Sequence, residues 1–292
     1  MKTGTILTSL ILVSALCALG PAEVAADQEL ERQLISQYRD KILALRHSFK
    51  SNSQEYDAEG RPVMTGEEGS WTVYGRIAVK KVVLDADKLR LEGTRVLYIL
   101  EDRGKRLQPS RMREDVKITI QLKNPVNSAD QVAGVLNLVF AISPEDVVKS
   151  APSYWKVYLT EQDSSGQSQK KVGLPDGQTM QQEPNLGDNA PEHDQVFKVG
   201  EKGVSPPKIL YQPEPEFSDL ARKMSYQGTL GMSVLVDKSG SVRNVQVVHP
   251  LGMGLDENAV ATIGTWRFEP AMRDGQPVVV SLYIEVSFQL GR

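Results

Sequence analysis

A chain of 292 residues is long enough for two ordinary domains, and 40% hydrophobic with 24% charged residues is typical of globular proteins. The formal net charge of −3 argues against a nucleic-acid-binding surface. The single cysteine, Cys17, excludes a framework of intramolecular disulfides.

The first residues have the pattern of a signal peptide. Lys2 precedes an apolar run over residues 6–19, and small residues follow up to Ala26. The run is shorter than the ~20 residues that a membrane-spanning helix needs. We therefore expect residues 1–26 to be removed and the mature chain to be periplasmic or secreted. The alternative is an uncleaved anchor at residues 6–19 that faces the periplasm from the inner membrane.

Residues 27–160 are predicted to form an α+β domain, mainly an antiparallel sheet with helices. Ser128 and Gln131 have capping-box spacing, and Ser143 precedes a proline at the first position of a second helix. The other expected elements are a helix at 27–38 and strands at 71–79, 82–84, 89–91, 94–100, 116–122 and 154–159. We find no family resemblance here. An enzyme site in this region is an alternative without a supporting motif.

Residues 161–198 are predicted to be a disordered linker. Gln, Ser, Gly, Asp and Pro dominate the segment, and few apolar residues are available to bury.

Residues 199–292 are predicted to form a second α+β domain of two helices and three strands. Ser218 is a good N-cap, and the last strand alternates apolar with polar residues from Val278 to Leu290. The expected elements are helices at 219–226 and 255–265 and strands at 230–236, 242–249 and 278–290. Short connections favour an antiparallel sheet in the order 2-1-3, which leaves the second and last strands as edges.

The residues from Pro206 to Leu290 resemble the C-terminal domain of the TonB family. The resemblance rests on Tyr226-Gln227-Gly228, Val236-Asp237 with Gly240, Gly254-Leu255-Asp256, Trp266-Arg267-Phe268 with Pro270-Ala271, and Gly275 with Pro277-Val278. It implies two helices on a three-stranded antiparallel sheet. It also implies a protein partner, typically an extended segment of an outer-membrane receptor that adds to an exposed sheet edge.

By that resemblance the last strand is the expected binding edge, and the Pro-rich approach to the first helix is a further contact. The predicted partner-binding residues are Ser281, Tyr283, Glu285 and Ser287 on the strand and Gln212, Pro213, Pro215 and Phe217 in the approach. An exposed edge also permits pairing of two copies into a homodimer.

An energy transducer of the TonB type is the alternative function, with residues 6–19 as its anchor and outer-membrane transport as its task. The family's transducers have a histidine in the anchor and a long Pro-rich spacer. Here the apolar run has no histidine, the linker has three prolines, and a folded domain precedes it. These departures favour a binding protein of the cell envelope.

No catalytic, cofactor or metal site is predicted, so we expect no enzyme activity. His249 stands far from His47 and His193 in the sequence and is best interpreted as an ordinary strand-end residue. Trp266 and Phe268 follow an amphipathic helix and are expected in the core.

Overall fold

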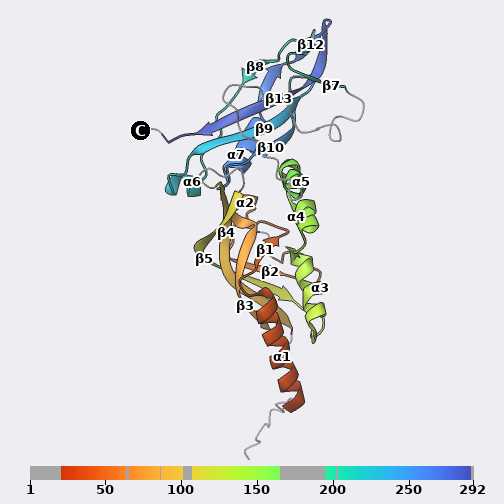
Figure 1. Cartoon of the computed structure of the whole chain (residues 1–292), viewed down its shortest axis with the longest axis vertical. Helices are drawn as coiled ribbons and strands as arrows, with labels where there is room; N and C mark the ends of the chain where they lie inside the picture. Colours follow the sequence, from red (N-terminus) through yellow and green to blue (C-terminus); the bar gives the residue numbers. More distant parts are fainter. Residues whose placement is uncertain are drawn as a thin grey trace, which may run out of the picture.

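The computed structural model describes residues 21–63, 66–85, 87–100, 107–164, 195–201 and 203–290. Two domains, each with its own sheet, follow one another along the long axis of the molecule (Figure 1). The predicted signal segment up to residue 20 and most of the predicted linker lie outside the described residues.

The N-terminal domain is a six-stranded sheet in the order β2-β5-β4-β3-β1-β6, antiparallel except for the parallel pair β2 and β5. Its strands are β1 (Ile42–Leu45), β2 (Ser53–Tyr56), β3 (Arg76–Leu84), β4 (Lys88–Leu100), β5 (Leu107–Gln121) and β6 (Phe140–Ala141). Helices α1 (Pro21–Tyr38) and α3 (Ala129–Val139) supply Leu34 and Leu136 to its core, to which all six strands also contribute. The predicted α+β class and largely antiparallel sheet are observed.

Both predicted helix caps of this domain are present. The Ser128 hydroxyl accepts the Gln131 N–H at 3.3 Å and caps α3. Ser143 caps α4 (Pro144–Ser150) by accepting the Asp146 N–H. The first helix begins at Pro21 and not at Asp27.

The strand predicted at 154–159 is helical instead, and the one predicted at 71–79 is helical in its first half and belongs to β3 from Arg76 onward. Residues 71–74 form α2 (Trp71–Tyr74), and residues 153–164 form a 3₁₀ turn, η1 (Ser153–Trp155), followed by α5 (Lys156–Ser164). Trp155 and Tyr158 are both buried in one cluster with Trp71. A spacing of three residues on one face is helical and not extended, which explains the error.

The C-terminal domain has the predicted strand order, because β10, β9 and β13 are neighbours in that order and both pairs are antiparallel. Its elements are β7 (Val196–Lys198), β8 (Lys208–Tyr211), α6 (Asp219–Lys223), β9 (Gly228–Val236), β10 (Val242–His249), α7 (Leu255–Ile263), β11 (Arg267–Glu269), β12 (Ala271–Arg273) and β13 (Gln276–Phe288). Ser218 caps α6 as predicted. Trp266 and Phe268 lie in the core, as expected.

Four short strands of this domain, β7, β8, β11 and β12, were not predicted from the sequence. β12 pairs with residues 276–278 of β13, and β7 pairs in parallel with residues 279–281 of the same strand. β7 falls inside the range given to the linker, and α5 extends to Ser164, so the ordered regions reach into both ends of that range. Phe197 explains the first difference, because its buried side chain joins the core of the C-terminal domain.

No helix in the described part of the chain is long and apolar enough to span a membrane.

Candidate binding edge and its surroundings

The outer edge of β13 is divided into a covered and an open part. On one side, β13 pairs with β9 from Val280 to Phe288. On the other side, β7 covers residues 279–281, while β12 pairs with residues 276–278, beyond the end of the pairing with β9. Among the described residues, no strand pairs with residues 282–288 on that side. We call residues 282–288 the open stretch.

The hairpin between β12 and β13 and the pairing with β9 determine which backbone groups point out of the open stretch. Asp274 and Gly275 have φ values of 51° and 78°, and Arg273 pairs with Gln276, as in a two-residue type I′ turn. The Gln276 N–H therefore points toward β12. The Asp237 N–H bonds to the Ser241 carbonyl on the β10 side, so the next amide of β9, that of Val236, points toward β13. Val236 pairs with Val280, so the even-numbered amides of β13 face β9 and the odd-numbered ones face the open edge. The bond from the Leu290 N–H to the Gln227 side chain has the same direction.

The predicted binding residues of β13 are only partly available. The side chains of Tyr283, Glu285 and Ser287 are exposed on the face of the sheet away from the helices. Ser281 is half-buried and pairs with Lys198 of β7, so its inclusion in the exposed edge was wrong. The sequence did not reveal this, because a three-residue strand has no detectable period.

The Pro-rich approach is held by the domain itself. The Pro213 carbonyl accepts the Trp266 indole N–H at 3.0 Å, and the Glu216 carbonyl accepts the Asn258 side-chain amide at 2.9 Å. Phe217 packs edge-to-face on Phe288, with ring centroids 5.3 Å apart. Of the four predicted residues, Gln212 is exposed, whereas Pro213, Pro215 and Phe217 are half-buried.

The opposite side of the C-terminal sheet is occupied by the N-terminal domain. Strand β10 lies against η1 and α5, and Val247 is buried in a cluster with Trp71, Trp155 and Tyr158. The junction buries apolar side chains of both domains, so the open stretch of β13 is the accessible edge of this sheet.

Polar contacts fix the junction on α7. Thr72 donates its backbone N–H and its hydroxyl to the two carboxylate oxygens of Glu257, each at 2.9 Å. The same hydroxyl accepts the Gly254 N–H at 2.9 Å. Nearby, the Tyr226 hydroxyl accepts the Leu100 N–H at 2.8 Å. These bonds join α2 to the start of α7 and the end of β4 to the segment between α6 and β9.

Two carboxyl groups lie side by side at this helix start. The Asp256 carboxylate is fully buried and accepts the N–H groups of Leu251 and Gly252. Burial, followed by the charge of Glu257, raises the pKa of Asp256 to about 8, and the two N–H donors oppose the rise. Burial also raises the pKa of Glu257, against the bonds from Thr72. These groups stabilise the loop and the junction.

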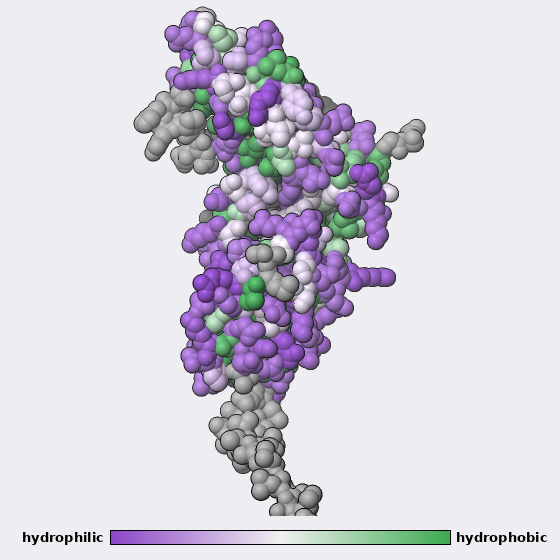
Figure 2. Space-filling view, turned by 180° about the vertical axis from the view of Figure 1, so that it is seen from behind, coloured by the Kyte–Doolittle hydropathy of each residue, from purple (hydrophilic) through white to green (hydrophobic). Residues whose placement is uncertain are grey.

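The sequence reasoning missed an exposed apolar strand. In β8, which pairs with β11, Ile209, Leu210 and Tyr211 have 56%, 68% and 56% of their surface exposed. Hydrophobic surface appears on the C-terminal domain at the upper end of the molecule in the space-filling view (Figure 2). Three consecutive large apolar residues between prolines were the available signal.

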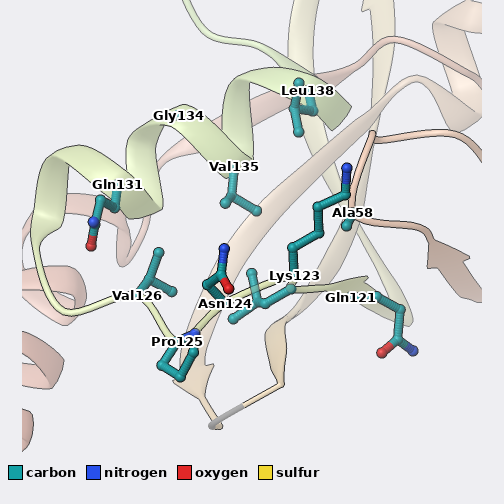
Figure 3. A pocket seen from close by; sticks show the side chains of 11 residues that line it. Ala58, Gln121, Lys123, Asn124, Pro125, Val126, Gln131, Gly134, Val135 and Leu138 are labelled. Atoms are coloured by element: carbon teal, nitrogen blue, oxygen red, sulfur yellow. The ribbon is translucent and has the colours of Figure 1, made fainter.

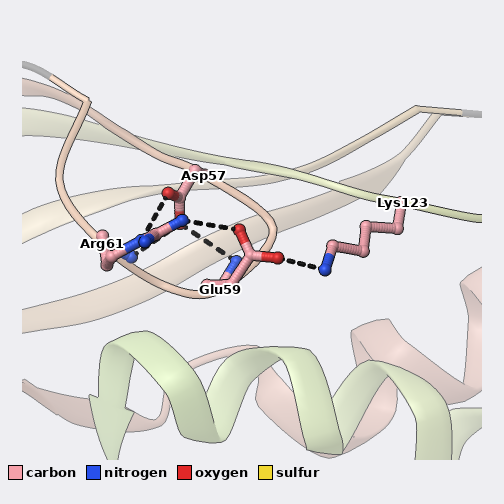
Figure 4. A network of polar contacts seen from close by, with 4 residues as sticks. All are labelled: Asp57, Glu59, Arg61 and Lys123. Carbon is pink, nitrogen blue, oxygen red and sulfur yellow. Dashed lines mark hydrogen bonds and ion pairs between the residues drawn. The ribbon is translucent and has the colours of Figure 1, made fainter.

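The N-terminal domain has an open hollow of about 330 Å³ between α3 and the segment after β5. Val135 points into it, and Lys123 and Asn124 line the facing wall (Figure 3). Lys123 also ion-pairs with Glu59, which joins Arg61 and Asp57 in a surface network (Figure 4). Among the described residues no group of three metal-binding side chains occurs, and this wall carries no nucleophile with an adjacent base.

Comparison with known proteins assigns the C-terminal domain. Residues 213–290 match the family described as "Gram-negative bacterial TonB protein C-terminal". This chain contains a TonB C-terminal domain. It is 30% identical over 86 residues to Protein TonB of Vibrio cholerae serotype O1, and 33% identical over 82 residues to Protein tonB2 of Pseudomonas aeruginosa.

The match to these TonB proteins is partial. It covers 29% and 28% of this chain and 35% and 30% of the two relatives, so the chain spans about a third of their length. The solution NMR structure of the Pseudomonas aeruginosa TonB CTD aligns with 34% of this chain and 100% of its own, at 16% identity and a TM-score of 0.25. At that score the alignment adds no argument, and the assignment rests on the sequence matches.

Proposed function

We propose that this chain is a binding protein of the cell envelope whose TonB domain holds an extended segment of a partner protein at the open stretch of β13. The observation that carries the proposal is the edge itself. On the side away from β9, residues 282–288 lack a partner strand among the described residues, whereas β7 covers residues 279–281 and the N-terminal domain packs against β10. Added backbone hydrogen bonds supply affinity, and alternate side chains supply selectivity.

The side chains around the open stretch suit a segment that alternates apolar and polar residues. On the helix face, Leu282 and Ile284 are only half-buried against the core. On the other face, Tyr283, Glu285 and Ser287 are exposed. An added strand would cover the first pair with one set of its side chains and meet the second group with the other. We propose an outer-membrane receptor as the partner, in line with the TonB domain.

A matched pair of cysteine variants tests this proposal. Ser281→Cys and Ser287→Cys, made in a Cys17→Ser background, place the same residue on the same face of β13, in its covered and open parts respectively. After labelling with benzophenone-maleimide in native envelopes, irradiation should crosslink position 287 to an extended segment of an outer-membrane protein, with little product at 281. Equal yields, or products only at 281, would contradict the edge assignment.

We further propose that the mature chain begins at Asp27 and lies in the periplasm, that residues 165–194 form a linker, and that the role is binding and not catalysis. The similarity to Protein TonB keeps the anchored transducer as a second candidate. The N-terminal residue and the membrane partitioning of the native protein distinguish the two. A soluble chain that starts at Asp27 fits the binding protein, whereas a full-length membrane-bound chain fits the transducer.

A further inference from the structure

Three strands of the C-terminal sheet bring a histidine and a tyrosine together over a glycine. Nδ1 of His249 and the hydroxyl of Tyr283 lie 3.1 Å apart, and their rings meet edge-to-face at 85° with centroids 6.1 Å apart. Gly231 of the central strand pairs with His249 on one side and with Glu285 on the other. The tyrosine of β13 therefore reaches diagonally across β9 to β10.

Gly231 is needed for space and not for its backbone conformation. It is absent from the glycines with positive φ, so any residue could adopt its backbone angles. A Cβ at this position would lie 2.1 Å from the Tyr283 hydroxyl and 3.0 Å from His249 Nδ1. Glycine inside a strand is unfavourable by itself and often marks the close approach of another group. Here that group is the ring of Tyr283.

This contact fixes the direction of Tyr283 beside the open stretch. Its hydroxyl lies over the central strand, so the ring leans away from the outer edge of β13. The side chain is 39% exposed. A ring that is already held loses little rotamer freedom when a partner binds, and it leaves the space above the edge free.

We infer that His249 and Gly231 are positioning residues for recognition at the open stretch: they hold Tyr283 over β9, clear of the edge, so that the side chains of an added strand find a fixed aromatic wall. The inference rests on the proposed function. In an added strand, the residue opposite Tyr283 would have its Cβ about 4.5–5.5 Å from that of the tyrosine. A large apolar side chain fits there, because it packs against the near side of the ring.

Three variants in the Ser287→Cys reporter background separate positioning from folding. His249→Leu removes the ring nitrogen, His249→Gln supplies an amide oxygen as a substitute acceptor, and Gly231→Ala pushes the tyrosine hydroxyl aside. Photocrosslinking yield in native envelopes reports binding. The NMR signal of Tyr283 in protein labelled with ¹³Cζ-tyrosine reports ring position, and circular dichroism confirms folding.

The expected result is a Tyr283 signal that shifts in His249→Leu and Gly231→Ala and returns in His249→Gln. Crosslinking should fall about two- to tenfold in the first two variants, as for one side chain that must be ordered on binding, and recover in the third. An unmoved Tyr283 signal, or an unchanged yield despite a moved signal, would overturn the inference. Loss of crosslinking in the Ser287→Cys parent itself would instead overturn the proposed function.

Discussion

Thr72 is the polar centre of the domain junction, and Thr72→Val should lower the free energy of unfolding markedly. The substitution keeps the shape of the side chain and removes its hydroxyl. One oxygen of the Glu257 carboxylate then loses its donor, and the Gly254 N–H loses its acceptor. Thr72 is fully buried, so water cannot replace these partners.

The size of the effect follows from the two groups left without partners. A buried group without its partner costs about 1–3 kcal/mol, so the pair should cost about 2–6 kcal/mol in total. Thr72→Ser is the matched control, because it retains the hydroxyl and loses one methyl group, worth about 1 kcal/mol. The junction contributes to both domains, so we also expect the unfolding transition to broaden or split in Thr72→Val.

Urea unfolding followed by tryptophan fluorescence measures this difference. Trp71 and Trp155 lie in the junction cluster, and Trp266 lies in the C-terminal core, so both regions have a reporter. If Thr72→Val stays within about 0.5 kcal/mol of the parent, or if Thr72→Ser costs more than Thr72→Val, the hydrogen bonds do not stabilise the junction.

Two further predictions concern single groups. The raised pKa of Asp256 means that the folded state holds this proton more tightly than the unfolded chain. Its contribution is therefore complete below about pH 4 and is lost as the pH rises through about 8. The free energy of unfolding should fall over this range, with a flatter slope in Asp256→Asn; an identical slope would refute the assignment. Gly134 lies inside α3, where an added Cβ would meet nothing within 4 Å, so Gly134→Ala should raise the free energy of unfolding by about 0.5–1 kcal/mol in urea titration. Destabilisation by this substitution would show that the helix or the adjacent hollow requires glycine.

The C-terminal fold could be predicted because its helix caps and turns are determined by residues that lie close together in the sequence. Ser218 caps α6, as predicted, and the turn from Asp237 to Gly240 joins the two predicted strands β9 and β10. The alternation of the last strand predicted which side chains enter the core. The strand order followed from the hairpin and from a helical crossover that returns parallel to its second strand, because few topologies are compatible with both.

The division of the β13 edge could not be predicted, because it depends on pairing between distant segments. Lys198 meets Ser281 only through the tertiary fold, and three residues are too few for a period-two signal. The direction of each amide of β13 also depends on the tertiary fold. It is determined by the pairing with β9 and by the type I′ turn at Asp274 and Gly275.

Sequence patterns also did not predict two contacts, the one between His249 and Tyr283 and the one between the domains at Thr72. The first requires the register of three strands, although glycine at position 231 was a visible sign of close approach. The second buries Glu257 at a helix start, where a carboxylate is ordinarily explained by the helix dipole. In both cases the sequence shows the residue, and only packing shows its partner.

Residue-resolved amide hydrogen exchange of β13 is the most direct test of strand addition at the open stretch. In the free protein, the amides of Tyr283, Glu285 and Ser287 should exchange quickly, while those of Leu282 and Ile284, bonded to β9, stay protected. A synthetic peptide of the segment captured at position 287 should protect the first three and leave the last two unchanged. Protection of all five amides in the free protein, or peptide-induced protection at β8 instead, would contradict the account.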